Sequence, residues 1–260
     1  ALTCFLASYF TRRYDEVRGK KFSAAKPFIV MGVLGIFLLA QPDLGSTVVL
    51  FVIPFGMLFI VGANFWQFIL LIGTGILLFV WLVLSASYRL KRFTGFLEPF
   101  KDPYGTGFQL TNSLMAFGRG EISGEGLGNS IQKLDYLPEA HTDFIMAIIG
   151  EEFGFIGILV VVILLGLLIF RAMKIGRESL MLEQRFRGFF ALGISFWIFF
   201  QGFVNLGMAL GMLPTKGLTF PLVSYGGSSI IIMSATVGIL LRIDHENRLQ
   251  RGGQARLRDD

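Results

Sequence analysis

Residues 144–170 read FIMAIIGEEFGFIGILVVVILLGLLIF, an apolar run whose only charged side chains are those of Glu151 and Glu152. A helix rises about 1.5 Å per residue, so about 20 such residues cross the roughly 30 Å hydrocarbon core of a bilayer. The run lacks the alternation of period two that a strand of a membrane barrel needs. It therefore predicts a transmembrane helix.

Similar apolar runs flank this one along the chain, and the composition agrees with a membrane protein. With 53% hydrophobic residues, 16% charged residues and a mean hydropathy of +0.66, too little polar surface is left for a soluble chain. Residues 1–10 look like the end of a partial span, so we expect earlier spans to precede them. We predict an all-α fold, a single polytopic transmembrane helical bundle over residues 1–260. Its complete spans are predicted at residues 27–40, 44–62, 66–86, 144–170, 188–210 and 227–241.

Lys and Arg residues decide which connections face the cytoplasm. They concentrate in residues 11–26, 171–187 and the tail 242–260, and the six spans place all three segments on one side. The positive-inside rule makes this side the cytoplasm, so residues 87–143 and 211–226 face outward. The net charge of +5 is explained by cytoplasmic segments that face anionic membrane lipid, and it requires no nucleic-acid partner.

The outer loop, residues 87–143, is far longer than an ordinary connection and carries most of the polar chemistry. It is densely charged from Arg89 to Asp143, yet nearly neutral overall. One cysteine and two histidines exclude an internal disulfide and a Cys/His zinc site, so any metal would have to be held by carboxylates.

Residues 118–130 of the loop read GRGEISGEGLGNS. Closely spaced glycines let backbone N–H groups turn inward around an anion such as a diphosphate. The signal alone is weak, because the segment lacks the Gly-Lys-Ser/Thr ending of a P-loop, and a plain flexible turn is the favoured interpretation. Both interpretations stay open.

The loop ends in LPEAHTDFI, residues 137–145, where Asp143 stands at the start of an apolar helix. Asp143 suits an N-cap, which accepts a hydrogen bond from the first free N–H groups. The helix face that carries Asp143 also carries the small residues Ala147, Gly150, Gly154 and Gly157. Small side chains at this spacing let another helix approach closely. The stripe therefore predicts that Asp143 points into the bundle at the mouth of a groove.

Glu151 and Glu152 follow about 12 Å further along the same helix. Ionisable groups at membrane depth are costly and usually face a cavity or a partner. They form either a structural pair, satisfied by Ser, Gln or backbone of a neighbouring helix, or a part of the site.

Two further segments interrupt apolar sequence. Pro42 and Asp43, in QPDLGST, turn one span into the next, and Asp43 can cap the second. Residues 211–229 read GMLPTKGLTFPLVSYGGSS, which predicts a re-entrant or broken segment before the last helix, enclosed by protein or lining a water-filled cavity. Lys216 is its sole charge and either snorkels to the headgroups or pairs with a carboxylate or a substrate phosphate.

With these segments, the chain resembles the SEDS family (shape, elongation, division and sporulation). The resemblance covers the whole chain and is carried by QPDLG at 41–45, GEGLGNSIQKLDYLPEAHTDFI at 124–145, GEEFG at 150–154, and the signature from Asn205 to SYGGSS at 224–229. GNSIQKLDYLPEAH favours the cell-division branch over RodA, in which Arg is expected in place of Ala140. The family has ten spans, so about three and most of a fourth are missing here.

The resemblance implies a peptidoglycan glycosyltransferase that polymerises lipid II into glycan strands during septal cell-wall synthesis. Asp143 falls on the family's catalytic carboxylate, which would deprotonate a sugar 4-hydroxyl while undecaprenyl diphosphate leaves. Cations would offset the charge that builds on the diphosphate, and a divalent cation, Mg²⁺ or Mn²⁺, could assist. The candidate substrate-binding residues are Lys216, Lys133, Arg119, Glu151 and His141.

The implied partners are lipid II, the growing glycan strand, a class B penicillin-binding protein (FtsI), and FtsQ, FtsL, FtsB and FtsN of the division complex. The implied location is the bacterial inner membrane at the septum. Two alternatives remain: a lipid II flippase, whose path could use Glu151, Glu152 and the broken segment, and a division-complex scaffold without chemistry. The position of the polar cluster at the outer surface favours the enzyme.

Overall fold

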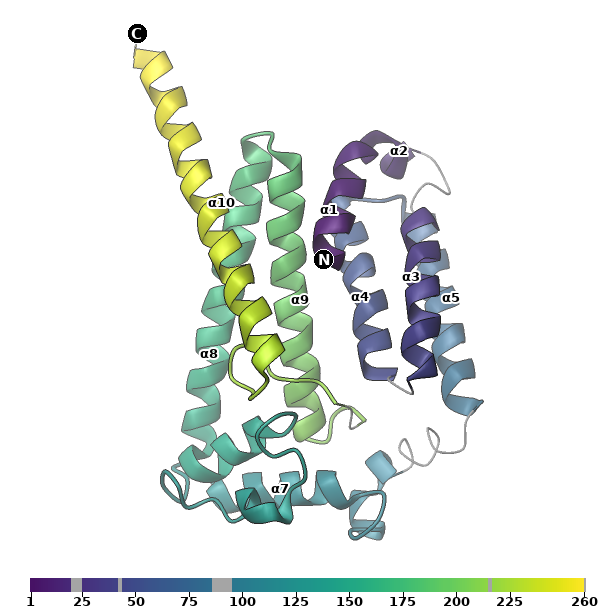
Figure 1. The fold of residues 1–260 in the computed structure, drawn as a ribbon, viewed down its shortest axis with the longest axis vertical. Helices are drawn as coiled ribbons and strands as arrows, with labels where there is room; N and C mark the ends of the chain where they lie inside the picture. Colours follow the sequence, from purple (N-terminus) through teal and green to yellow (C-terminus); the bar gives the residue numbers. More distant parts are fainter. Residues whose placement is uncertain (20–24, 42–43, 86–94, 215–216, 260) are drawn as a thin grey trace. The chain divides into compact units, whose positions relative to one another are not determined.

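The structure is a computed structural model that describes residues 1–19, 25–41, 44–85, 95–214 and 217–259. Every regular element in these ranges is a helix, which confirms the all-α prediction (Figure 1). Three helices are long and apolar enough to cross a membrane, at Ile145–Met181, Arg185–Ala209 and Gly227–Gly252. Three shorter apolar helices lie at Lys26–Ala40, Gly45–Val61 and Phe68–Leu84. Each predicted span thus overlaps a helix.

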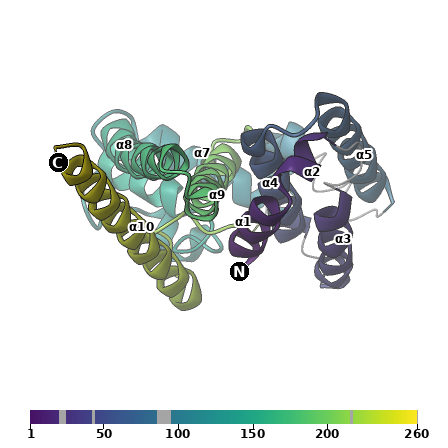
Figure 2. The same cartoon turned by 90° about the horizontal axis from the view of Figure 1, so that it is seen from above.

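The chain divides into two compact units, of which the first comprises residues 1–75, 167–199 and 232–260. Its N-terminal helices are α1 (Leu2–Arg12), α2 (Tyr14–Gly19), α3 (Ala25–Ala40), α4 (Leu44–Val61) and the first half of α5 (Phe65–Leu84). Helix α1 packs against α4, as both views show (Figure 2). Their contact is an apolar core that includes Leu6, Phe10, Met57 and Leu58.

The last helix, α10 (Gly227–Asp259), extends well beyond the predicted span 227–241. Asn247 is fully buried and bonds Ser179 Oγ and the Ile175 carbonyl, both on α8 (Ile145–Met181). The predicted cytoplasmic tail, residues 242–260, is thus helical for most of its length, because polar side chains such as Asn247 find partners on α8.

The second unit comprises residues 76–166 and 200–231 and holds every described candidate site residue. It contains the 3₁₀ turn η1 (Pro99–Lys101), the helix α7 (Phe108–Gly120), the π turn η2 (Gln132–Tyr136), the first half of α8 and the end of α9 (Arg185–Ala209). The predicted outer loop thus contains a helix of its own. The described residues of this segment, 210–214 and 217–226, are not helical, as predicted for the broken segment.

Helix α8 is broken inside its predicted span. Gly154 has φ 64° and ψ −162°, a backbone conformation that no helix contains and that side chains disfavour. The predicted continuous stripe of small residues is therefore wrong, because the helix changes course at one of its members. Gly150 still permits a close approach, but the element that approaches is α7: a Cβ on Gly120 would lie 1.9 Å from the Gly150 carbonyl oxygen.

Candidate functional site

The segment that carries Asp143 is a compact turn ahead of α8. The backbone N–H groups of Thr142, Asp143 and Phe144 all donate to the Glu139 carbonyl, at 3.1–3.2 Å. Phe144 and Ala140 are buried in a small apolar cluster with Ala147 of α8. Asp143 itself is half-buried. Packing on either side therefore holds this carboxylate at the edge of the unit.

Three consecutive carbonyls of this turn accept hydrogen bonds from sequence-distant groups. The N–H of Tyr225 donates to the His141 carbonyl at 2.9 Å, Ser224 Oγ donates to the Thr142 carbonyl at 2.6 Å, and Asn205 Nδ2 donates to the Asp143 carbonyl at 2.8 Å. We call these three bonds the carbonyl clamp. They fix the backbone from which the Asp143 side chain projects, which is the preorganisation that a catalytic group requires.

The irregular segment after α9 is itself held by polar side chains of α9. Asn205 Nδ2 also donates to the Leu218 carbonyl, and Gln201 Nε2 donates to the Thr219 carbonyl at 2.8 Å. Ser224 Oγ accepts the N–H of Phe220 at 2.6 Å. Non-helical backbone in this segment is thus satisfied by protein groups, as a broken segment within a membrane protein requires.

The same segment lies next to the Asp143 carboxylate. A Cβ built on Gly217 would lie 3.2 Å from Asp143 Oδ2, so glycine leaves space at this position. Lys216, the preceding residue, lies outside the described residues, as do Asp43 and Arg89. Gly217, which follows Lys216 in the sequence, thus lies next to Asp143. That Lys216 itself lies near Asp143 stays a prediction.

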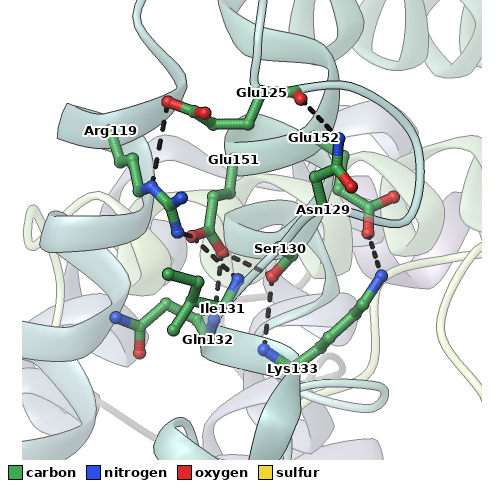
Figure 3. A network of polar contacts seen from close by, with 9 residues as sticks. All are labelled: Arg119, Glu125, Asn129, Ser130, Ile131, Gln132, Lys133, Glu151 and Glu152. Atoms are coloured by element: carbon green, nitrogen blue, oxygen red, sulfur yellow. Dashed lines mark hydrogen bonds and ion pairs between the residues drawn. The ribbon is translucent and has the colours of Figure 1, made fainter.

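A second polar cluster surrounds Glu151, whose side chain is fully buried (Figure 3). Its Oε1 accepts Arg119 Nη1 at 3.1 Å and the N–H of Ile131 at 3.1 Å. Its Oε2 accepts the Ser130 hydroxyl and, at 3.2 Å, the N–H of Gln132. The Ser130 hydroxyl and the backbone N–H groups of Ile131 and Gln132 donate to Glu151, as expected if Glu151 has a structural role. These donors belong to the outer loop, however, and not to a neighbouring helix.

Two further ion pairs border this cluster. Lys133 Nζ lies 2.6 Å from Glu152 Oε1, and Arg119 Nε lies 3.8 Å from Glu125 Oε1. Arg119 and Lys133, predicted to face the substrate, thus both contact carboxylates of the protein (Figure 3). Their role in substrate binding stays a prediction, and so does that of Glu151 and His141.

The glycine-rich segment does not cradle an external anion with residues 124–126. The N–H of Gly124 donates to the Gly120 carbonyl, and those of Glu125 and Gly126 donate to the Glu151 and Glu152 carbonyls at 3.0 Å. Gly124, Gly126 and Gly128 have positive φ, so the segment does use glycine for its turns. The backbone N–H groups of Ile131 and Gln132, just after this segment, instead donate to the carboxylate of Glu151.

Asn205, Gln201 and Ser224 were missed as site residues by reasoning from residue chemistry alone, although the family signature begins at Asn205. Gln201 and Asn205 stand four residues apart in the otherwise apolar residues 196–209 of α9, so they share one face, and this spacing was the available signal. Asn205 is fully buried, and within the described ranges its Oδ1 has no hydrogen-bond partner.

A metal site made by protein side chains alone does not fit the described residues, since no three His, Cys, Asp or Glu groups converge there. A divalent cation stays an expectation from the family resemblance.

Comparisons with known proteins identify the family to which the chain is similar. Residues 1–249 match the cell cycle protein family of FtsW, RodA and SpoVE. The probable peptidoglycan glycosyltransferase FtsW of Pasteurella multocida is 84% identical over 260 residues, which are 100% of this chain and 66% of that protein. The protein of the same name from Haemophilus influenzae is 87% identical over the same share of both chains. The chain thus spans about two thirds of the length of these relatives.

Two solved structures are similar in fold. A structure described as the structural coordination of polymerization and crosslinking by a peptidoglycan synthase complex matches with a TM-score of 0.74 and 28% identity, over 95% of this chain and 68% of that chain. The rod shape determining protein RodA of Thermus thermophilus matches with a TM-score of 0.58 and 25% identity, over 95% of this chain and 65% of that chain.

Proposed function

The chain belongs to the cell cycle protein family of FtsW, RodA and SpoVE, and on this basis we propose that it is a division-type peptidoglycan glycosyltransferase. The substrate is lipid II, which the enzyme polymerises into glycan strands. Relatives at 84% and 87% identity carry the name of this activity. The protein would act in the inner membrane at the septum.

Asp143 is the proposed general base. Its carboxylate takes the proton of the sugar 4-hydroxyl as that oxygen forms a bond to the anomeric carbon of the second substrate. The bond from this carbon to the diphosphate breaks, and undecaprenyl diphosphate leaves with the electron pair. Both lipid substrates present their sugars at the outer surface, so the base must stand there, and general-base catalysis is worth about 10²- to 10⁴-fold in rate.

The carbonyl clamp is the observation that carries the proposal. Three hydrogen bonds hold residues 141–143 from the outside, at 2.6–2.9 Å, although an ordinary helix start needs none of them. An N-cap alone requires only local bonds within the first helical turn. Bonds from α9 and from residues 224–225 instead fix the backbone of Asp143 relative to the segment that contains Gly217.

Charge neutralisation of the departing diphosphate is assigned to Lys216, supported by the contact of its neighbour Gly217 with Asp143. An ammonium group stabilises a developing anion most strongly where water is excluded. Arg119 and Lys133 are weaker candidates, because each already pairs with a carboxylate. The proposed partners remain a class B penicillin-binding protein, FtsI, together with FtsQ, FtsL, FtsB and FtsN.

The test is polymerisation of lipid II by the full chain with its penicillin-binding partner, comparing Asp143→Asn with Glu139→Gln. Asparagine is a good N-cap and nearly isosteric, so the variant folds, but its amide cannot accept the hydroxyl proton. We expect Asp143→Asn to lose at least about a hundredfold of glycan synthesis. Glu139→Gln removes a carboxylate from the same turn and should keep activity.

Glycan synthesis by Asp143→Asn within a few-fold of the parent, at equal protein level, would overturn the assignment. Lipid II transfer across vesicles by Asp143→Asn is measured in parallel, because a flippase should retain this transfer without the Asp143 carboxylate.

A further inference from the structure

The turn of residues 121–127 is bonded by its backbone into the break of α8. Beyond the two bonds from Glu125 and Gly126, the N–H of Phe155 donates to the Glu121 carbonyl at 2.9 Å, and the N–H of Ile156 donates to the Ile122 carbonyl at 3.2 Å. Ideal Cβ atoms on Gly124 and Gly154 would clash with backbone atoms of the opposite segment. The turn therefore lies at the level of residues 151–156 along α8.

The position of this level in the bilayer follows from the charges on α8. Arg171 is the first charged residue after the apolar residues 153–170. A hydrocarbon core of about 30 Å takes about 20 helical residues, so counting back from Arg171 places its outer boundary near Glu151 and Glu152. Phe155 and Ile156 then lie about 5 Å inside the hydrocarbon.

Exposed side chains of α8 agree with this boundary. Phe155 and Ile156 are 59% and 53% exposed, and the helix continues with exposed apolar residues towards its cytoplasmic end. This face belongs to a helix that is long and apolar enough to cross a membrane, and lipid is the apolar medium that covers such a face. The surface next to the turn is thus lipid-facing.

The turn adds two large apolar side chains to that surface. Ile122 is 69% exposed and Leu127 is 77% exposed, and Ile122 follows the residue whose carbonyl is bonded to Phe155. Arg119 and Lys133, on either side of the turn in sequence, pair with Glu151 and Glu152 at the boundary itself. Charged groups at the headgroup level with apolar groups just below is the pattern of an interfacial membrane anchor.

We infer that the turn of residues 121–127 lies at the outer interface of the membrane, where Ile122 and Leu127 insert among phospholipid acyl chains while the exposed carboxylates of Glu121 and Glu125 stay at the headgroup level. The glycine-rich segment is then a lipid-binding element of the outer loop. This inference does not depend on the proposed enzymatic activity, because it rests on backbone bonds, exposure and the position of charges along α8.

Fluorescence quenching of single cysteines tests the inference in the full chain, after Cys4→Ser removes the native thiol. Ile122→Cys and Leu127→Cys are labelled with a polarity-sensitive dye and reconstituted into phosphatidylethanolamine–phosphatidylglycerol vesicles. The quenchers are phosphatidylcholine with a nitroxide near the carbonyl end or the methyl end of the acyl chain, and aqueous iodide. Lys101→Cys serves as the water-exposed control and Ile163→Cys as the deep lipid-facing control, since both side chains are exposed.

We expect the labels at residues 122 and 127 to be quenched severalfold more by the shallow nitroxide than by iodide, with blue-shifted emission. The Ile163→Cys label should respond most to the deep nitroxide, and the Lys101→Cys label only to iodide. Iodide quenching at residues 122 and 127 equal to that of Lys101→Cys would overturn the inference. Protection from all three quenchers would also overturn it, because protein would then cover the turn.

Discussion

Replacing Glu151 by glutamine turns one oxygen of a fully buried carboxylate into an NH₂ group that faces donors. Each oxygen of Glu151 accepts two hydrogen bonds, so two of the four donors lose their acceptor. If Oε2 is the atom replaced, the Ser130 hydroxyl can rotate and accept, but the N–H of Gln132 cannot. An unsatisfied buried donor costs about 1–3 kcal/mol.

Loss of the negative charge adds to this cost. Bonds to Arg119 and Ile131 become neutral-acceptor bonds, which are roughly half as strong, and each loses about 1 kcal/mol. Together the two effects predict a loss of about 3–5 kcal/mol of unfolding free energy, the range typical when one partner of a buried ion pair is removed.

Equilibrium unfolding of the purified protein in mixed micelles, followed by circular dichroism, measures this difference. Glu125→Gln is the matched control, because it removes a carboxylate that is 40% exposed and 3.8 Å from the same arginine. Its expected cost is under about 1 kcal/mol. If the two variants unfold with free energies within about 1 kcal/mol of each other, Glu151 is not the centre of a stabilising network.

Three other predictions concern the site and the orientation. Asn205→Leu leaves the Asp143 and Leu218 carbonyls without their shared donor. Glycan synthesis at equal protein level should therefore fall at least tenfold, which corresponds to an increase of about 1.4 kcal/mol in the activation free energy. Unchanged synthesis would show that the carbonyl clamp is dispensable. Lys216→Ala should lower polymerisation well beyond any loss of protein, whereas normal activity would favour snorkelling. Gly118→Cys should be labelled from outside by an impermeant thiol reagent, and Met181→Cys should not. Both residues are exposed, and Gly118 lacks the close backbone contacts that are found at Gly120. The reverse labelling pattern would invert the assigned sides.

Hydropathy was sufficient to place the long helices, because lipid selects for apolar sequence over a length set by the bilayer. It did not predict α7, whose polar residues such as Asn112 are buried against the loop, with Asn112 Nδ2 donating to the Tyr136 carbonyl at 3.1 Å. Nor did it predict that α10 continues to Asp259, since that extension depends on Asn247 reaching α8. Both features depend on tertiary contacts that no local pattern reports.

For the candidate site, the sequence indicates Asp143 as the centre, which stays a prediction, and it does not indicate the groups that surround Asp143. Asp143 stands out because it lies in LPEAHTDFI, a segment that carries the family resemblance, at the outer end of an apolar helix, although an N-cap would also place a carboxylate there. The break at Gly154 gave no distinct signal, because an apolar run carries no information on φ. The carbonyl clamp was equally hidden: its acceptors are backbone carbonyls, and the sequence shows only that Asn205 and Ser224 need partners.

The break in α8 also bears on the order in which this protein is built into the membrane. Residues 121–126 emerge from the ribosome before residues 151–156, yet each segment supplies the backbone partners of the other. Until the loop has crossed to the outer side, the N–H groups of Phe155 and Ile156 can bond only within α8, for example to the carbonyls of Glu151 and Glu152, so the break cannot take its final form. The outer end of α8 is therefore expected to settle at its final depth only after the loop has docked, so translocation of the loop precedes completion of the helix.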